Sequence, residues 1–322
     1  MKTLLVVVEH RKGVIRDITF EMLGKAGEIC KTHNLQLTAV VLGWEVDSFL
    51  SPLSERADTV LVLKREEFKQ FDADLYKEAL NQLIAETQPW VTLMGQTSWG
   101  LDLAPCLAVK TGFPLASDCL DLLIDGERLT ALRQRYGGKI FTKVSFTDAP
   151  GVLLTIRPGA FPADKPGTYS GEIIQKELTA PLPQPRKKFL EYLDSGAGEI
   201  DIAQADFLIS VGRGMGEEDN LAEIKEFVQA MGGTLSCSRP IVDKKWLPKY
   251  HQVGTSGKSV KPKVYLALGI SGAFQHVAGI SGAGTVIAVN RDPKAPIFRV
   301  AQYGVVADMF KIIPALREKL GA

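Results

Sequence analysis

The chain has 322 residues and a formal net charge of +1 at pH 7. Its length allows two domains with large cores, and 45% hydrophobic with 23% charged residues is an ordinary globular composition. The near-zero charge predicts no nucleic-acid binding, and apolar runs such as Leu4–Val8 are too short for direct membrane insertion.

The N-terminus and the cysteines bear on the compartment of the protein. MKTLLVVVEH combines a lysine with an apolar run, as signal peptides do, but it lacks a small-residue cleavage site. We therefore interpret Leu4–Val8 as a buried strand. The four cysteines, Cys30, Cys106, Cys119 and Cys237, are scattered without metal-type pairs. This pattern is typical of buried thiols in a reducing compartment, and it predicts a cytoplasmic protein without a metal site.

The N-terminal half alternates strand and helix patterns. Short apolar runs predict strands at Leu4–Val8, Leu37–Leu42, Thr59–Leu63 and Trp90–Met94. Apolar residues at helical spacing predict helices at Arg16–Thr32, from Asp72 or Asp74 to Glu86, and at Leu101–Lys110. Such an alternation predicts an α/β fold with a parallel sheet.

The pattern changes between residues 119 and 156. Four β-type runs follow one another, at Leu120–Ile124, Leu129–Arg135, Lys139–Phe146 and Gly151–Ile156. Asp125-Gly126 and Gly137-Gly138 are hairpin-type turns between them. We predict antiparallel strands added to the parallel sheet, and a structural turn after them at Arg157–Phe161.

One loop of this half has two interpretations. Gly95–Gly100 stands at a strand end before a helix, where an anion can bind. It also fits an ordinary polar connection, which is the interpretation we prefer.

Composition divides the chain into two domains. Residues 180–188, APLPQPRKK, are rich in proline, which fixes φ and removes a backbone donor. We predict an N-terminal domain at residues 1–180, a linker at 181–199 and a C-terminal domain at 200–322. The second domain should contain strands at Phe207–Val211, Leu235–Cys237, Val264–Leu268 and Thr285–Val289, and helices at Asn220–Met231 and from about Asp308 onward.

The stretch Val264–Asp308 has the strand, glycine turn and helix start of nucleotide-binding folds. Gly269-Ile270-Ser271-Gly272 follows one apolar strand, and a second strand ends near Asn290. Glycines let the backbone come close to a phosphate, and the free N–H groups at a helix start favour negative charge. By itself this spacing supports only a phosphate or dinucleotide site.

The residues of this stretch say more than their spacing. The order GISGAFQH, VNRDPKAPIF and YGVVADMFKIIP resembles the C-terminal FAD domain of electron-transfer flavoprotein α subunits, near-continuously from Val211 to about Leu320. The resemblance implies an N-terminal parallel-sheet α/β domain with added antiparallel strands, followed by a Rossmann-like (DHS-type) FAD-binding domain. It also implies FAD as the cofactor.

The resemblance assigns cofactor-binding positions residue by residue. They are Arg213, Ser238, Arg239, Gln252, Val253, Gly254, Thr255, Ser256, Gly269, Ser271, Gly272, Ala273, Phe274, Gln275, His276, Asn290, Asp308 and Met309. Three of them are expected to tune the flavin. Arg239 would place a fixed positive charge against the ring, Ser256 a hydroxyl near N5, and a protonated His276 would stabilise the anionic semiquinone.

Some of these positions have a simpler interpretation or depart from the family. The family reads QVGQTGK where residues 252–258 read QVGTSGK, so Thr255 lacks the usual amide while Ser256 keeps a hydroxyl. This loop is not a phosphate-binding P-loop, because no glycine lies five residues before Gly257. Asp308 could equally be a helix cap, and a glycine turn around Arg213 is by itself a weak signal.

The resemblance implies the α subunit of a heterodimeric electron-transfer flavoprotein. Such a chain pairs with a β subunit, which can carry AMP or a second FAD. It takes electrons from an acyl-CoA-type dehydrogenase, as in fatty acid oxidation, and passes them to a quinone-linked oxidoreductase. No nucleophile–base pair or carboxylate dyad stands out in the sequence, which fits an electron carrier better than a catalyst of substrate chemistry.

Three alternatives remain open. A self-contained FAD- or NAD-dependent oxidoreductase would need a substrate pocket with acid–base residues. An electron-bifurcating flavoprotein subunit would share these motifs, because in the resemblance the second flavin belongs to the partner. A structural or regulatory nucleotide-binding protein would hold a redox-silent ligand.

Overall fold

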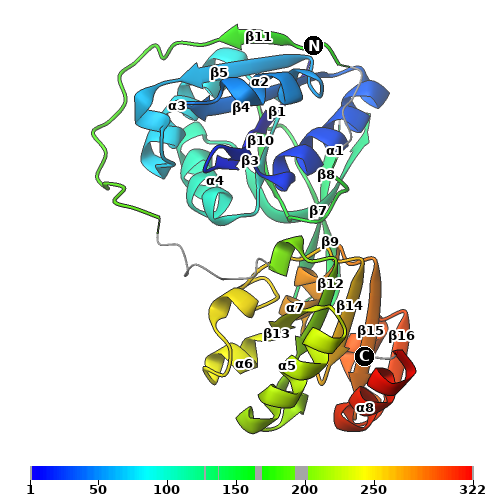
Figure 1. Ribbon diagram of the computed structural model, residues 1–322. Coiled ribbons are helices and arrows are strands. Elements are labelled where there is room, and N and C mark those ends of the chain that lie inside the picture. Colours follow the sequence, from blue (N-terminus) through cyan, green and yellow to red (C-terminus); the bar gives the residue numbers. More distant parts are fainter. Residues whose placement is uncertain (1, 127, 137, 164–168, 193–201, 321–322) are drawn as a thin grey trace. The chain divides into compact units, whose positions relative to one another are not determined.

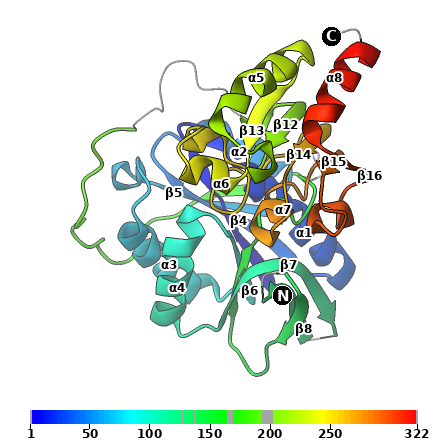
Figure 2. The ribbon, with the colours of Figure 1, turned by 90° about the horizontal axis from the view of Figure 1, so that it is seen from below.

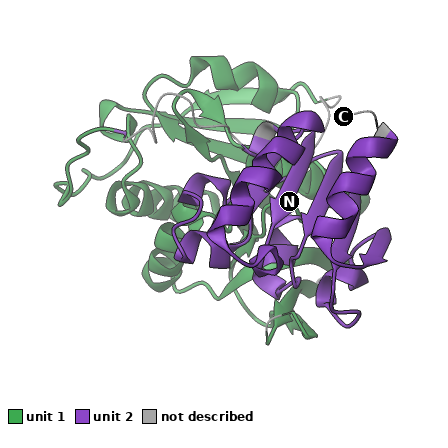
Figure 3. Ribbon diagram, turned by 60° about the horizontal axis from the view of Figure 1, so that its bottom comes forward, with its two compact units in different colours: residues 1–191 green, residues 192–322 purple. Residues whose placement is uncertain are grey.

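The computed structural model describes residues 2–126, 128–136, 138–163, 169–192 and 202–320. The chain forms two compact units, Met1–Glu191 and Tyr192–Ala322, coloured separately in Figure 3. Residues 193–199 of the predicted linker lie outside the described residues, and residues 181–192 contain neither helix nor strand.

Unit 1 is built on a nine-stranded sheet in the order β11-β5-β4-β1-β6-β10-β7-β8-β9 (Figure 1). Its strands are β1 (Thr3–Val7), β4 (Gln36–Gly43), β5 (Thr59–Lys64), β6 (Val91–Gly95), β7 (Leu115–Asp125), β8 (Arg128–Arg135), β9 (Ile140–Ser145), β10 (Val152–Ile156) and β11 (Glu172–Gln175). The antiparallel part is β7-β8-β9, and the other neighbours pair in parallel. A small hairpin joins β2 (His10–Arg11) to β3 (Val14–Ile15).

The prediction for one strand was wrong. Gly151–Ile156 was expected among the added antiparallel strands, whereas β10 lies inside the sheet, parallel to both β6 and β7. All five of its residues are buried. A short strand that is buried along its whole length is covered on both faces, as central parallel strands are, and an edge hairpin would alternate buried and exposed residues instead.

Four helices cover the two faces of this sheet. They are α1 (Asp17–His33), α2 (Asp47–Ser54), α3 (Ala73–Thr87) and α4 (Ser98–Thr111). Successive β1 residues point to opposite faces: Leu4 packs with the cluster under α1 and α2, and Leu5 with the cluster under α3 and α4. Asp72 is the cap of α3, since its carboxylate accepts from two backbone N–H groups. The sequence pattern did not predict α2 or β11.

The position in the Gly95–Gly100 loop where an anion could bind is already occupied by side chains of unit 1. Thr97 Oγ1 accepts from the backbone N–H of Trp99 at 3.2 Å and of Gly100 at 3.4 Å, and it donates to Glu9 Oε2 at 2.7 Å. Glu9 is buried at the end of β1. A carboxylate therefore already stands at the start of α4, which favours the interpretation of this loop as a polar connection.

Unit 2 is an open, wholly parallel sheet in the order β13-β12-β14-β15-β16. Its strands are β12 (Phe207–Val211), β13 (Thr234–Cys237), β14 (Val264–Leu268), β15 (Thr285–Asn290) and β16 (Tyr303–Val306), and its helices are α5 (Leu221–Ala230), α6 (Arg239–Asp243), α7 (Phe274–Gly279) and α8 (Met309–Leu320). Helices α5 and α8 lie side by side over one apolar face (Figures 1 and 2). The predicted α/β fold class is confirmed. Strand β16 was missed because all its residues are exposed.

Two further observations concern the sequence predictions. Among the helices that the structure describes, none combines the length and the hydrophobicity needed to span a bilayer. Cys30, Cys119 and Cys237 are buried as expected, but Cys106 is exposed on α4, so the expectation of four buried thiols was wrong for this residue.

Glu9→Gln tests the buried carboxyl. Burial raises the pKa of Glu9, and this effect exceeds the lowering by the Thr97 hydrogen bond. A raised pKa means that the folded chain favours the neutral form, so this contribution to stability is present below pH 4.5 and is lost as the pH rises through the folded pKa. The neutral Gln should therefore raise the guanidinium midpoint at pH 7, with no gain below pH 4.5.

The measurement is tryptophan fluorescence during guanidinium unfolding of the whole chain, once at pH 7 and once below pH 4.5. The exposed Glu28 of α1 supplies the control, because Glu28→Gln should leave the midpoint unchanged. A lower midpoint for Glu9→Gln at pH 7 would show that the ionised carboxylate stabilises the loop.

Candidate functional site

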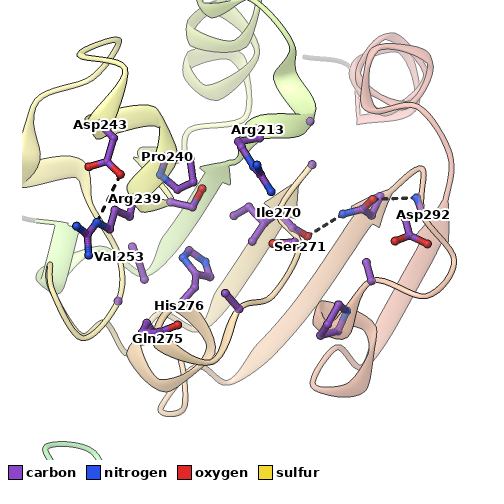
Figure 4. A pocket seen from close by; sticks show the side chains of 18 of the residues that line it. Arg213, Arg239, Pro240, Asp243, Val253, Ile270, Ser271, Gln275, His276 and Asp292 are labelled. Atoms are coloured by element: carbon purple, nitrogen blue, oxygen red, sulfur yellow. Dashed lines mark hydrogen bonds and ion pairs between the residues drawn. The ribbon is translucent and has the colours of Figure 1, made fainter. Parts of the chain in front are cut away.

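A cavity of about 720 Å³ lies in unit 2 at the carboxyl ends of its parallel strands (Figure 4). This is the edge at which open α/β sheets bind ligands, and the volume lies within the range of about 300–1,000 Å³ usual for ligand sites. The predicted positions that line it are Arg213, Ser238, Arg239, Val253, Gly254, Ser256, Gly269, Ser271, Ala273, Gln275, His276 and Asn290. Segments far apart in the sequence thus meet at one edge.

Two glycine turns pack backbone against backbone at this edge. A Cβ on Gly214, after β12, would lie 2.6 Å from the Cα of Gly269, after β14, and a Cβ on Gly269 would lie 2.7 Å from the Cα of Gly214. Gly269 also has φ +63°, which favours glycine. Only glycine at both positions allows this approach, and the two turns together form a cradle in which a ligand can contact the backbone.

Two arginines bring positive charge to the cavity. Arg213 belongs to a short 3-10 turn (Arg213–Met215) after β12, and Arg239 begins α6. The Nε of Arg239 lies 3.5 Å from Oδ2 of Asp243, but both side chains are more than half exposed, so the pair is weak. Guanidinium groups are suited to phosphate oxygens and to the polar edge of a planar ring.

The loop at residues 252–258 presents one hydroxyl to the cavity. Gln252 Nε2 donates to Ser256 Oγ at 2.7 Å, which leaves the Ser256 hydrogen to be donated elsewhere. Gln252 is itself buried and does not line the cavity. Gln252 therefore orients the hydroxyl of Ser256 and does not itself face the cavity. Thr255 also lies outside the lining, and its backbone N–H donates to the carbonyl of Gln275 at 2.9 Å.

His276 is buried on α7 and lines the cavity. Figure 4 shows its ring among Pro240, Val253 and Ile270. Nε2 lies 2.8 Å from Oη of Tyr265, and Nδ1 is buried without a hydrogen-bond partner in the described residues. Burial lowers the pKa of His276 to about 4, against a smaller opposing effect of the Val253 backbone. Burial by the chain alone therefore favours the neutral imidazole, and the protonated His276 expected from the resemblance stays a prediction.

Asn290 connects the end of β15 to the glycine turn after β14. Its Nδ2 donates to the carbonyl of Ile270 at 2.8 Å, and its Oδ1 accepts from the backbone N–H of Asp292 at 2.9 Å (Figure 4). These bonds fix the orientation of the amide, so any contact with a ligand would use its second hydrogen or its second lone pair.

Four other predicted positions lie outside the cavity lining, namely Gly272, Phe274, Asp308 and Met309. Met309 is 3% exposed and belongs to the apolar core of unit 2. Asp308 Oδ1 accepts from the backbone N–H of Phe310 at 3.1 Å, and Oδ2 pairs with Arg291. The helix-cap interpretation of Asp308 agrees with these bonds, and the cofactor contacts of all four residues stay predictions.

Sequence reasoning missed several lining residues. They are Gly214, Pro240, Asp243, Ile270, Asp292, Ala295 and Pro296. Asp243 could have been found, because it stands four residues after Arg239 on the same helix, a spacing that brings side chains together. The others depended on how the loops fold back.

Comparisons with known proteins agree with this geometry. Residues 4–181 match a family model described as Electron transfer flavoprotein domain, and residues 201–281 match one described as Electron transfer flavoprotein FAD-binding domain. The chain is 40% identical to the Electron transfer flavoprotein subunit alpha of Methylophilus methylotrophus, with 100% of both chains covered. It is 35% identical to the protein of the same name from Thermoanaerobacterium thermosaccharolyticum, over 99% of this chain and 98% of that protein.

A third relative has a different name. The chain is 32% identical to the Lactate dehydrogenase (NAD(+),ferredoxin) subunit LctC of Acetobacterium woodii, over 97% of this chain and 75% of that protein.

The residues of the cavity fit FAD. The cradle of Gly214 and Gly269 admits close backbone contact with a pyrophosphate, and Arg213 can neutralise it. Arg239, Ser256 and Nδ1 of His276, which makes no hydrogen bond of good geometry within the described residues, are polar groups at the cavity that suit a planar ring. FAD is therefore the cofactor of the C-terminal unit, and the chain belongs to the electron-transfer flavoprotein α-subunit family.

Proposed function

We propose that this chain is the FAD-binding subunit of a heterodimeric electron-transfer flavoprotein. It would pair with a β subunit, take electrons from an acyl-CoA-type dehydrogenase and pass them to a quinone-linked oxidoreductase. The observation that carries the proposal is the cavity of unit 2, in which a glycine cradle and two arginines are combined with a hydroxyl and an imidazole. The printed names of the relatives, which call them subunit alpha, support a partner subunit.

The residues of the cavity would divide the work between two parts of the cofactor. Bound FAD supplies one- and two-electron transfer. The backbone at Gly214 and Gly269, with Arg213, would hold the pyrophosphate. Arg239 and Ser256 would contact the ring, where a fixed positive charge favours the form of the ring with more negative charge. The chain itself moves no substrate atoms; it holds and tunes the flavin.

Substitutions of the Arg239–Asp243 pair should shift the flavin potential in opposite directions. Arg239→Ala removes a positive charge and should lower the two-electron potential, whereas Asp243→Asn removes a negative charge and should raise it. Each shift should reach about 20 mV, the equivalent of roughly 1 kcal/mol for a partly solvated charge. Potentiometric titration of the FAD-loaded complex measures both. Equal potentials in the two variants would place the guanidinium away from the ring.

Arg213→Ala should weaken FAD binding. Loss of a hydrogen bond between charged groups costs about 1.5–3 kcal/mol, so the dissociation constant should rise by roughly 10- to 100-fold. Fluorescence titration of the cofactor-free complex gives this value, and added salt should reduce the difference from the wild type. Lys225→Ala is the control, since Lys225 is exposed on α5 and does not line the cavity. A loss of affinity in both variants would argue against a local contact of Arg213.

The function itself is tested by electron exchange. The chain is co-purified with its β subunit, loaded with FAD and mixed with a substrate-reduced acyl-CoA dehydrogenase, and flavin absorbance is followed with time. Rapid reduction, followed by reoxidation through a quinone-linked acceptor, is expected. A complex that binds FAD but exchanges electrons only with nicotinamide and ferredoxin would assign the chain to another electron-transfer system, and a complex without affinity for FAD would contradict the proposal.

A further inference from the structure

His276 lies next to buried polar groups to which the proposed function assigns no role. Its Nε2 lies 2.8 Å from Oη of Tyr265, which stands on β14 and has no exposed surface. Ser210 on β12 and Ser236 on β13 are equally inaccessible. Among the described residues, neither serine hydroxyl has a hydrogen-bond partner of good geometry. Three hydroxyls and one imidazole thus meet in an otherwise apolar interior.

The strand register places the three hydroxyls on the same face of the sheet. Ser210 pairs with Ser236 on one side and with Ala267 on the other. Tyr265 stands two residues before Ala267, so its side chain leaves the sheet on the same face. Burial raises the pKa of Tyr265, whereas the hydroxyls of Ser210 and Ser236 lower it, as donors to a phenol oxygen do. Tyr265 therefore keeps its own hydrogen, and in the described residues neither serine makes a hydrogen bond of good geometry with its oxygen.

The hydrogen of the Tyr265 hydroxyl needs an acceptor, because a buried donor without one is costly. Among the described residues, the group that lies within hydrogen-bond distance of Oη is Nε2 of His276, at 2.8 Å, and neither serine hydroxyl takes this place. A neutral imidazole that accepts at one nitrogen carries its hydrogen on the other. The hydrogen is then on Nδ1, which is buried and makes no hydrogen bond of good geometry in the described part of the chain, although the Val253 backbone lies close enough to act on the ring. The ring of His276 lines the cavity (Figure 4).

We propose that Tyr265 is a positioning residue that holds His276 as the neutral Nδ1–H tautomer, so that the cavity receives a hydrogen-bond donor and no positive charge from this residue. The proposal rests on the proposed function, because an acceptor atom of the flavin ring is the group that this N–H would contact. Positive charge at the ring would come from Arg239 instead. His276 thus helps to orient the cofactor, and the guanidinium adjusts its charge.

The charged groups around His276 agree with a neutral ring. Those that line the cavity are Arg213, Arg239, Asp243 and Asp292, two of each sign. Cys237, which acts on Tyr265, is a buried thiol whose pKa burial raises to about 12, so it adds no charge at pH 7. The lining groups thus supply no excess of negative charge that would favour an imidazolium.

Nitrogen-15 NMR of the histidine side chains tests the proposal directly. The full chain is labelled at histidine and studied in complex with its β subunit, first without FAD, and His276→Gln identifies the signals of this ring among the four histidines. The expected result is a protonated Nδ1 and an unprotonated Nε2, unchanged from about pH 6 to about pH 8. Tyr265→Phe should convert this single tautomer into a mixture or into the Nε2–H form. Tyr303→Phe, on the exposed strand β16, should leave the signals unchanged.

An imidazolium or an Nε2–H tautomer in the wild type would overturn the proposal, and so would an unchanged tautomer in Tyr265→Phe. If Tyr265→Phe does not fold, the wild-type spectrum still decides between the forms. FAD titration separates this question from the proposed function. Added FAD should move the Nδ1 signal, and its dissociation constant should rise by roughly 3- to 10-fold in Tyr265→Phe. A complex that does not bind FAD contradicts the proposed function and leaves the tautomer result standing.

Discussion

The cavity of unit 2 depends on the close approach of two peptide backbones. The turns after β12 and β14 touch at Gly214 and Gly269, where any side chain would collide with the opposite backbone. Because neighbouring parallel strands end at the same edge, this contact brings Arg213 from one turn and Ser271 from the other to a single cavity. Without it, each turn would be an ordinary connection between a strand and a helix.

Polar groups around this cradle differ in how firmly they are held. Ser256 is oriented by the buried Gln252, and the imidazole of His276 contacts Tyr265, which has no contact with solvent. Arg239, in contrast, is exposed and has only a weak partner in Asp243. His276 is thus held in the interior, whereas Ser256 and Arg239 are exposed, and an exposed side chain can move at low cost.

The two units use a similar sheet edge in different ways. In unit 1, Glu9 and Thr97 occupy the start of α4 with a carboxylate and a hydroxyl of the chain. In unit 2, the corresponding kind of edge is lined by glycines and arginines and remains a cavity. The two sheets differ in strand order, and the sheet of unit 1 includes antiparallel strands, but both edges have parallel strands followed by turns and helices, so the side chains at these turns differ in whether they fill the edge. The edge of a parallel sheet can therefore serve as a ligand site where its backbone N–H groups and charged side chains are not already paired with other groups of the chain.

Local sequence was sufficient for the buried strands and the glycine turns of unit 2. Phe207–Val211 and Val264–Leu268 have the predicted bounds, because short apolar runs bounded by turn residues are typical of buried strands. Side-chain environments were decided only by tertiary structure. The sequence could not show that Gln252 contacts Ser256 or that β10 inserts between β6 and β7. Nor could it show that burial lowers the pKa of His276, since this burial comes from residues distant in the chain.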